Sequence, residues 1–338
     1  MRKLSILFLG AISSFAFSAS ALSIQTYGVT PSAMEQTVYV GGMPAGFTLK
    51  SGGVQVMGLC EVMSELGVRS PALLAGIRAG DRIEKVGNAS VESIEQLNTL
   101  VDKSKGKSLQ IELLRGNERL NIDVQPLKDS VTGRYKIGIL ARDSVSGIGT
   151  VTYIDMSGKF GALGHSVVGA NKQQLKMSDG VVFGCNIVSV NKGVRGKAGE
   201  LRGMFISDYK IGNAEKLCDC GIFGSVSTTF QTNDLMRAVA SSADVAPGKA
   251  YIYCTVNGEC PQKYDIEIVK VDKHGWENKH YVIKIVDEAL IEQTGGIVQG
   301  MSGSPIVQDG KLVGAVTHVF LNDPTRGYGI DIQTMLRQ

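Results

Sequence analysis

Apolar residues follow two different spacings in the N-terminal third of the chain. Between Ser90 and Val101 they recur at helical spacing, which predicts an amphipathic helix. A shorter helix is predicted after Ser70 and Pro71, because this pair is typical of a helix start and Gly76 is placed to end it. Short apolar runs around these helices predict strands at 54–59, 108–114 and 120–124.

The pattern changes from about Lys128 to the C-terminus. Short β-branched runs broken by glycines predict many strands, and Asp309-Gly310 suits a two-residue hairpin turn. Regularly spaced short strands are typical of a sandwich or a barrel. The one helix predicted in this half lies at the extreme C-terminus or near 233–240. We therefore expect a mostly β protein with minor helix.

Length and composition narrow the class of protein. With 338 residues, 43% of them hydrophobic and 20% charged, the chain is long enough for about two folded domains. Its 42 glycines suit a loop-rich, β-rich fold. A net charge of +3 without a dense Lys/Arg run argues against nucleic-acid binding. The sequence lacks His, Cys, Asp and Glu clusters at metal spacing, so we expect no metal and no cofactor.

The first residues have the order of an export signal. Met1-Arg2-Lys3 precedes an apolar stretch ending at Phe17, and Ala19-Ser20-Ala21 forms an A-x-A cleavage site. The apolar stretch is shorter than the roughly 20 residues that span a bilayer as a helix. We expect residues 1–21 to be a signal peptide; the alternative is an anchor removed later by the protein itself or another protease. The six cysteines of an exported chain permit disulfides, and their pairing stays open.

The segment Ser70–Ile83 reads S-P-A-L-L-A-G-I-R-A-G-D-R-I. In this order, and with the elements around it, it resembles bacterial PDZ domains. The resemblance implies that an exposed sheet edge and a glycine loop capture an extended peptide by strand addition. That loop would be Gly46, Phe47, Thr48 and Leu49; the alternative is that its glycines only serve a tight turn.

The loop Gly300-Met301-Ser302-Gly303-Ser304-Pro305 has the composition of a nucleophile loop. A catalytic serine needs a tight turn that exposes its hydroxyl and leaves backbone N–H groups free for the oxyanion. The flanking glycines allow such a turn, and the N–H groups of Gly300 and Ser302 are the natural donors. Serine also needs an adjacent base.

The chain has four histidines, and one of them is placed to act as that base. His165 follows the strand-like segment Phe160–Gly164, which would present its ring at a cleft. His274 and His280 lie in a polar stretch and are expected at the surface. His318 follows the hairpin after the nucleophile, where it either packs or lines the first substrate subsite.

Together these motifs resemble the SpoIVB sporulation peptidases. The matching segments are F-G-A-L-G-H at Phe160–His165, R-D-S-V-S-G-I-G-T at Arg142–Thr150, T-G-G-I-V-Q-G-M-S-G-S-P before and after Ser302, and G-A-V-T-H-V-F-L-N-D-P-T-R-G-Y-G after it. The resemblance implies a chymotrypsin-like serine endopeptidase with His165 as base and Ser302 as nucleophile. It points to Asp287 as the third member, while Asp179, Asp208 and Asp244 stay open.

The resemblance also implies a domain order and a role. We expect a linker with a self-cleavage region at 22–35, a PDZ-like domain at 36–127 and a trypsin-like double-barrel peptidase domain at 128–338. Such peptidases are exported into the space between forespore and mother-cell membranes, cut themselves near the N-terminus and clip a membrane-bound regulator. That cut triggers intramembrane processing of a sigma factor. Expected partners are therefore protein substrates, namely the chain's own N-terminal segment and the regulator, and a peptide bound by the PDZ domain.

Two other functions are compatible with parts of this pattern. A catalytically silent, PDZ-led binding protein would be expected to lack a catalytic residue, yet serine, histidine and carboxylate candidates are all present. An envelope quality-control protease would carry its PDZ domain after the peptidase domain, and here the PDZ-like motif comes first. Both alternatives are therefore less favoured than the regulatory peptidase.

Overall fold

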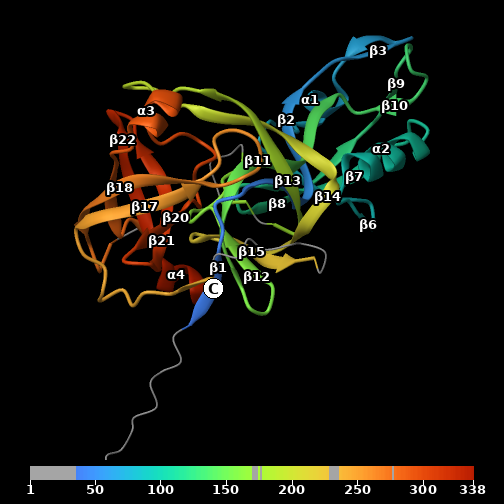
Figure 1. The fold of residues 1–338 in the computed structure, drawn as a ribbon. Helices are drawn as coiled ribbons and strands as arrows, with labels where there is room; N and C mark the ends of the chain where they lie inside the picture. Colours follow the sequence, from blue (N-terminus) through green and yellow to red (C-terminus); the bar gives the residue numbers. More distant parts are fainter. Residues whose placement is uncertain (1–35, 170–173, 176, 228–235, 276–277) are drawn as a thin grey trace, which may run out of the picture. The chain divides into compact units, whose positions relative to one another are not determined.

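The computed structural model describes residues 36–169, 174–175, 177–227, 236–275 and 278–338. The predicted signal peptide and the predicted self-cleavage region lie outside these residues. The fold is mostly β with minor helix, as the sequence predicts, and it contains two closed barrels (Figure 1). Within the described residues, no helix is long and apolar enough to cross a membrane.

Six antiparallel strands close the first barrel. They pair in the order β2-β11-β12-β15-β14-β13, and β13 returns to β2. Phe47, Leu49, Phe160 and Ile222 are buried in its core. The strands are β2 (Pro44–Leu59), β11 (Ile139–Asp155), β12 (Lys159–Ala162), β13 (Asp179–Asn191), β14 (Glu200–Cys218) and β15 (Gly221–Val226), and β1 (Thr37–Val40) and β16 (Met236–Ala238) extend the sheet beside β11.

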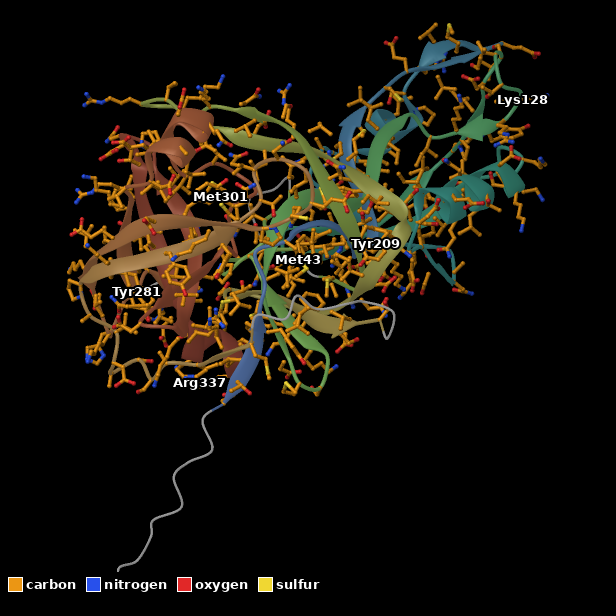
Figure 2. The ribbon with its side chains drawn as sticks, viewed as in Figure 1. Met43, Lys128, Tyr209, Tyr281, Met301 and Arg337 are labelled. Atoms are coloured by element: carbon orange, nitrogen blue, oxygen red, sulfur yellow. The ribbon has the colours of Figure 1, made fainter. Side chains whose placement is uncertain are left out.

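The second barrel is built from the C-terminal part of the chain, in the order β17-β18-β19-β22-β21-β20. Its strands appear in orange and red in Figure 1. Tyr281 and Met301 are fully or almost fully buried within its core, and Figure 2 labels both. The elements are β17 (Gly248–Cys254), β18 (Gln262–Val271), β19 (Tyr281–Ile285), α3 (Glu288–Thr294), β20 (Pro305–Gln308), β21 (Lys311–Phe320), β22 (Asp323–Asp331) and α4 (Ile332–Leu336).

A third hydrophobic core is formed mainly by the segment that connects β2 to β11. The far half of β2 pairs with β5, and β7 and β8 continue this sheet while α1 and α2 pack on it. Val54, Ile83, Leu97 and Ile111 are almost completely buried here. The elements are β3 (Val62–Ser64), β4 (Gly67–Arg69), α1 (Pro71–Ala75), β5 (Arg82–Val86), β6 (Ala89–Ser90), α2 (Ile94–Lys103), β7 (Leu109–Arg115), β8 (Glu118–Val124), β9 (Leu127–Lys128) and β10 (Tyr135–Lys136).

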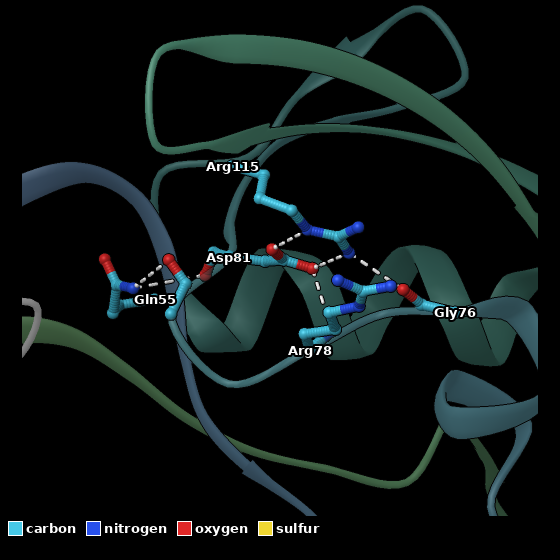
Figure 3. Close-up of polar contacts among 6 residues, drawn as sticks. Gln55, Gly76, Arg78, Asp81 and Arg115 are labelled. Carbon is cyan, nitrogen blue, oxygen red and sulfur yellow. Dashed lines mark hydrogen bonds and ion pairs between the residues drawn. The ribbon is translucent and has the colours of Figure 1, made fainter.

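A buried ion pair holds this third core together. Asp81, only 1% exposed, accepts two 2.8 Å hydrogen bonds from the Arg115 guanidinium and a third from the backbone N–H of Arg78 (Figure 3). Arg115 also donates to the carbonyl of Gly76 at the end of α1. A buried carboxylate needs such partners, because an unpaired charge away from water is costly.

The bounds expected for the PDZ-like domain, 36 and 127, differ from those of its core in the structure. Residues 44–50 of β2 pair with β11 on one side and β13 on the other, so they belong to the first barrel. The PDZ-like core begins only near Val54 and extends to Ala141, beyond the expected end at 127. The PDZ-like region is therefore an insertion between two strands of the first barrel rather than a domain that precedes it.

The predicted helices fare differently. Ser70 caps α1, and Gly76 ends it with a φ of 88°. The second helix begins three residues after Val91, because Ser93 supplies its N-cap. The prediction of a helix near 233–240 is wrong, because residues 236–238 form β16. The alternative at the C-terminus is confirmed by α4, and α3 was not predicted.

Candidate active site

Ser302 lies in the loop that leads into β20, and two glycines with left-handed backbone shape this loop. Gly300 has a φ of 98° and Gly303 a φ of 95°. A Cβ atom at Gly303 would lie 2.1 Å from the carbonyl oxygen of Thr150, so no other residue fits there without a shift of the backbone. The glycines predicted to permit the turn are thus required by close packing against the first barrel.

The loop is attached to the first barrel through Thr150 of β11. The backbone N–H of Thr150 donates to the carbonyl of Ser302 at 3.0 Å, and its hydroxyl donates to the carbonyl of Gly300 at 2.9 Å. Within the described part of the chain, the N–H groups of Gly300 and Ser302 donate no hydrogen bond. Both expected oxyanion donors are therefore available to an incoming carbonyl oxygen.

His165 follows β12 of the first barrel. Its ring is presented by a turn in which Leu163 and Gly164 have φ values of 69° and 74°. Nδ1 lies 2.8 Å from the carbonyl oxygen of Ser166. Because a carbonyl can only accept, Nδ1 must carry the proton in a neutral ring, and Nε2 is left with a lone pair. This is the tautomer that a general base for serine requires.

Burial lowers the pKa of His165 below its usual 6.5, and the hydrogen bond to Ser166 only partly opposes this effect. Desolvation disfavours the charged imidazolium. The ring is therefore neutral, and able to accept a proton, at neutral pH and somewhat below.

Ser302 and His165 both line one cavity of about 460 Å³, and so does His318. The His165 and His318 ring centroids are 5.1 Å apart. His318 therefore lies beside Ser302 and His165, and its role, packing or lining the first substrate subsite, stays a prediction. The structure thus brings together Ser302, His165, Gly300 and His318 from both barrels.

The Ser302 hydroxyl donates to the carbonyl of Thr317 at 2.9 Å rather than to an imidazole nitrogen. Two nearby hydroxyls, that of Ser304 in the serine loop and that of Thr317 in β21, are buried and have no hydrogen-bond partner among the described residues. Rotation about χ1 moves a serine hydroxyl between staggered positions at small cost. In this arrangement the Ser302 hydroxyl is engaged by Thr317, and a rotation about χ1 would be needed to direct it toward another acceptor.

Asp287 is not brought to His165. Its carboxylate accepts hydrogen bonds from the backbone N–H groups of Leu290 and Asp265, and so caps the start of α3. It does not line the cavity that holds Ser302 and His165. The resemblance to the family pointed to this aspartate, but in the structure its position directly before a helix makes it a capping residue.

The other carboxylates left open by the sequence do not line the cavity either. Asp179, at the start of β13, forms an ion pair with Lys50 at 3.4 Å. Asp208 and Asp244 are not among the residues that line the cavity. In the described part of the chain, the group that orients the His165 ring is the carbonyl of Ser166.

The expected peptide-binding loop Gly46–Leu49 is also placed differently. These residues lie inside β2, where pairing with β11 and β13 uses the backbone on both edges. A Cβ atom at Gly46 would lie 2.5 Å from the Phe205 ring, which explains the glycine by packing. The segment offers no open loop to a peptide carboxylate.

The PDZ-like region has its groove elsewhere, between α2 and the start of β11. A cavity of about 1190 Å³ lies there, and Ile137, Gly138 and Ile139 line it. Gly138 has a φ of 80°, and the described residues provide no strand partner for the edge of β11 that faces α2 at 139–143. The apolar-Gly-apolar triplet Ile137-Gly138-Ile139, which leads into β11, is the sequence signal for this groove, and it was not predicted.

Two barrels with a serine loop from one and a histidine turn from the other define a trypsin-like serine peptidase. A family model described as SpoIVB peptidase S55 matches residues 133–336, and a PDZ domain model matches residues 63–115. The chain belongs to the SpoIVB S55 peptidase family, and the matched regions include a PDZ domain.

Curated relatives match only part of the chain. A putative zinc metalloprotease of Lactococcus lactis is 35% identical over 71 residues, which are 21% of this chain and 16% of that protein. A putative zinc metalloprotease of Nostoc is 34% identical over 82 residues, 23% of this chain and 22% of that protein. The chain thus spans less than a quarter of the length of either relative. Among the described residues, no group of three or more His, Cys, Asp or Glu could hold a metal ion.

Solved structures are similar at low identity. The active form of the Rv3671c protease from M. tuberculosis is 14% identical, with a TM-score of 0.33, and the match covers 57% of this chain and 74% of that chain. The PDZ domain of an SdrC-like protein from Listeria monocytogenes is 22% identical, with a TM-score of 0.23, and the match covers 27% of this chain and 90% of that domain.

Proposed function

We propose that Ser302 is the nucleophile and His165 the general base of this peptidase. The observation that carries the proposal is the placement of His165: its Nδ1 lies 2.8 Å from the Ser166 carbonyl oxygen, which favours the tautomer with a lone pair on Nε2, and the ring lines the same cavity as Ser302. Nε2 takes the hydroxyl proton as Ser302 attacks the scissile carbonyl. It then gives that proton to the leaving amine, and the same steps with water release the acyl group.

The free N–H groups of Gly300 and Ser302 stabilise the oxyanion that forms during both attacks. The carbonyl of Ser166 supports the imidazolium, because it accepts a hydrogen bond from Nδ1–H in both protonation states of the ring. A neutral carbonyl stabilises that positive charge less than a carboxylate does. Such a base is better suited to slow, selective cleavage than to rapid, general proteolysis.

The finer role proposed for this chain is that of an exported regulatory endopeptidase. It would cut itself near its N-terminus and clip a membrane-bound regulator during spore formation, which triggers intramembrane processing of a sigma factor. Family membership and the export-type order of residues 1–21 support this role. The PDZ groove would hold either the regulator or the chain's own N-terminal segment.

Self-cleavage gives the most direct test. The full chain, made in a membrane-free cell-free system so that no signal peptidase is present, is followed over time by intact mass. We expect the wild type to lose an N-terminal fragment and Ser302→Ala to stay whole. If both stay whole and a fluorophosphonate probe fails to label Ser302, the catalytic roles are refuted and a PDZ-led binding protein is favoured.

A further inference from the structure

The cavity beside Ser302 is bounded by chain segments on both sides of the nucleophile. The segment before the serine contributes Ile297 and Val298, and the strand after its hairpin contributes Thr317 and Val319. A substrate whose carbonyl carbon meets the Ser302 hydroxyl must extend the adjoining side chain into this space. The walls of the cavity therefore determine which residue is accepted before the scissile bond.

These walls are apolar. Ile297 and Val298 are each 2% exposed, and Val319 is partly buried. Among the described residues that line the cavity there is no Asp, Glu, Lys or Arg, and its ionisable groups are His165 and His318. A charged substrate side chain would lose its water here without gaining an opposite charge, which is unfavourable, whereas an apolar side chain gains by leaving water.

Ile297 is held firmly between the serine loop and β22. Its backbone N–H donates to the carbonyl of Pro324 at 2.8 Å. A Cβ atom at Gly327 would lie 2.6 Å from the Ile297 Cδ1 atom, so the isoleucine side chain already fills the space against β22. A packed aliphatic side chain, rather than a charged group, thus occupies the position beside the nucleophile loop.

We infer that this peptidase cuts after large apolar side chains such as Leu, Met or Phe, and that Ile297 and Val319 select them. The inference rests on the proposed role of Ser302 as nucleophile. One missing methylene in an apolar pocket changes kcat/KM by about 10-fold or more. We expect Leu, Met or Phe to exceed Asp, Glu or Lys at this position by roughly 100-fold.

The experiment incubates the full chain with a library of peptides from digested cell protein and sequences the new termini. Cuts made by Ser302→Ala serve as background. Enrichment of Leu, Met or Phe directly before the cut supports the inference. Ser302-dependent cuts that follow charged or very small residues overturn it and leave the peptidase function standing. The absence of Ser302-dependent cuts refutes the proposed function and the inference with it.

A single substitution sharpens this test. Val319→Asp places a carboxylate in a partly buried wall of the cavity, and we expect it to reduce cleavage after Leu by about 10-fold or more and to favour Lys or Arg. Val188→Asp is the matched control, because Val188 is 52% exposed on β13 and does not line the cavity. Unchanged preference in Val319→Asp, with both variants folded by circular dichroism, contradicts the role of Val319.

Discussion

The catalytic cavity and the PDZ groove differ in chemistry although one strand, β11, contributes to both. Val145 and Ile148 line the catalytic cavity, and Ile139 and Asp143 line the groove. No Asp, Glu, Lys or Arg among the described residues lines the first, whereas the second has several: Glu95, Asp102, Lys103, Arg134 and Lys136. The cavity is suited to select a side chain by burial, and the groove to hold an extended segment by its backbone and charge.

The two regions are also held together by different contacts. The catalytic loop depends on packing between two barrels, seen in the hydrogen bonds of Thr150 to the Ser302 loop. The PDZ-like core depends on β5, β7 and β8, which extend the sheet from the far half of β2, and on the Asp81–Arg115 pair. A substitution that disrupts one region should therefore leave the other folded.

The largest effect is expected at the nucleophile and base. Ser302→Ala or His165→Ala should lower kcat on a cleaved peptide by about 10⁴-fold or more, because a nucleophile and its base act as one unit and the loss of either removes the contribution of both. The thermal unfolding midpoint should change little in Ser302→Ala, since the hydroxyl makes one hydrogen bond. Activity within 10-fold of wild type in either variant contradicts the assignment.

A large effect on stability, confined to the PDZ-like region, is expected from Arg115→Met. The variant leaves the buried Asp81 carboxylate with the N–H of Arg78 as its remaining partner. We expect the free energy of unfolding of this region to fall by about 3 kcal/mol, measured as faster hydrogen exchange in β5, β7 and β8. Exchange in β17–β22 should stay as in wild type. Equal loosening of both regions shows that they unfold as one unit.

A smaller effect is expected at Asp287. If it acts only as the cap of α3, Asp287→Asn keeps the cap and should retain kcat within about 3-fold, while Asp287→Ala should lower stability by about 1 kcal/mol. Chemical denaturation and peptide cleavage measure the two quantities. A drop of about 10⁴-fold in Asp287→Asn, with stability unchanged, is the result expected of a triad aspartate and contradicts the capping role.

The smallest expected effect is a shift in pH dependence. His165 must be neutral to accept the Ser302 proton, and burial lowers its pKa. Protonation therefore reduces kcat/KM only when the pH falls below the lowered value, so the acid midpoint should lie under 6.5. An acid midpoint above 6.5 indicates that a nearby negative charge, and not burial, dominates the environment of the ring.

Local patterns in the sequence were enough to identify several elements and part of the site. The Ser70 cap, the Gly76 stop and the Asp309-Gly310 turn form as predicted, because each depends on neighbouring residues alone. Ser302 and Gly300 likewise lie in a loop whose glycine spacing reveals it. These features are local consequences of backbone conformation.

Tertiary structure decided the rest. Gly46 reads like part of a loop, but long-range pairing of β2 with β11 and β13 places it inside a barrel, and the PDZ-like region becomes an insertion. Asp287 precedes the nucleophile in order, yet α3 takes its carboxylate as a cap, and the Ser166 carbonyl orients His165 instead. The sequence by itself determined the chemical groups, because residue types and short spacings are local. Which of these groups meet depends on contacts between residues more than a hundred positions apart, such as the hydrogen bond of Thr150 with Ser302, and only the folded chain determines that.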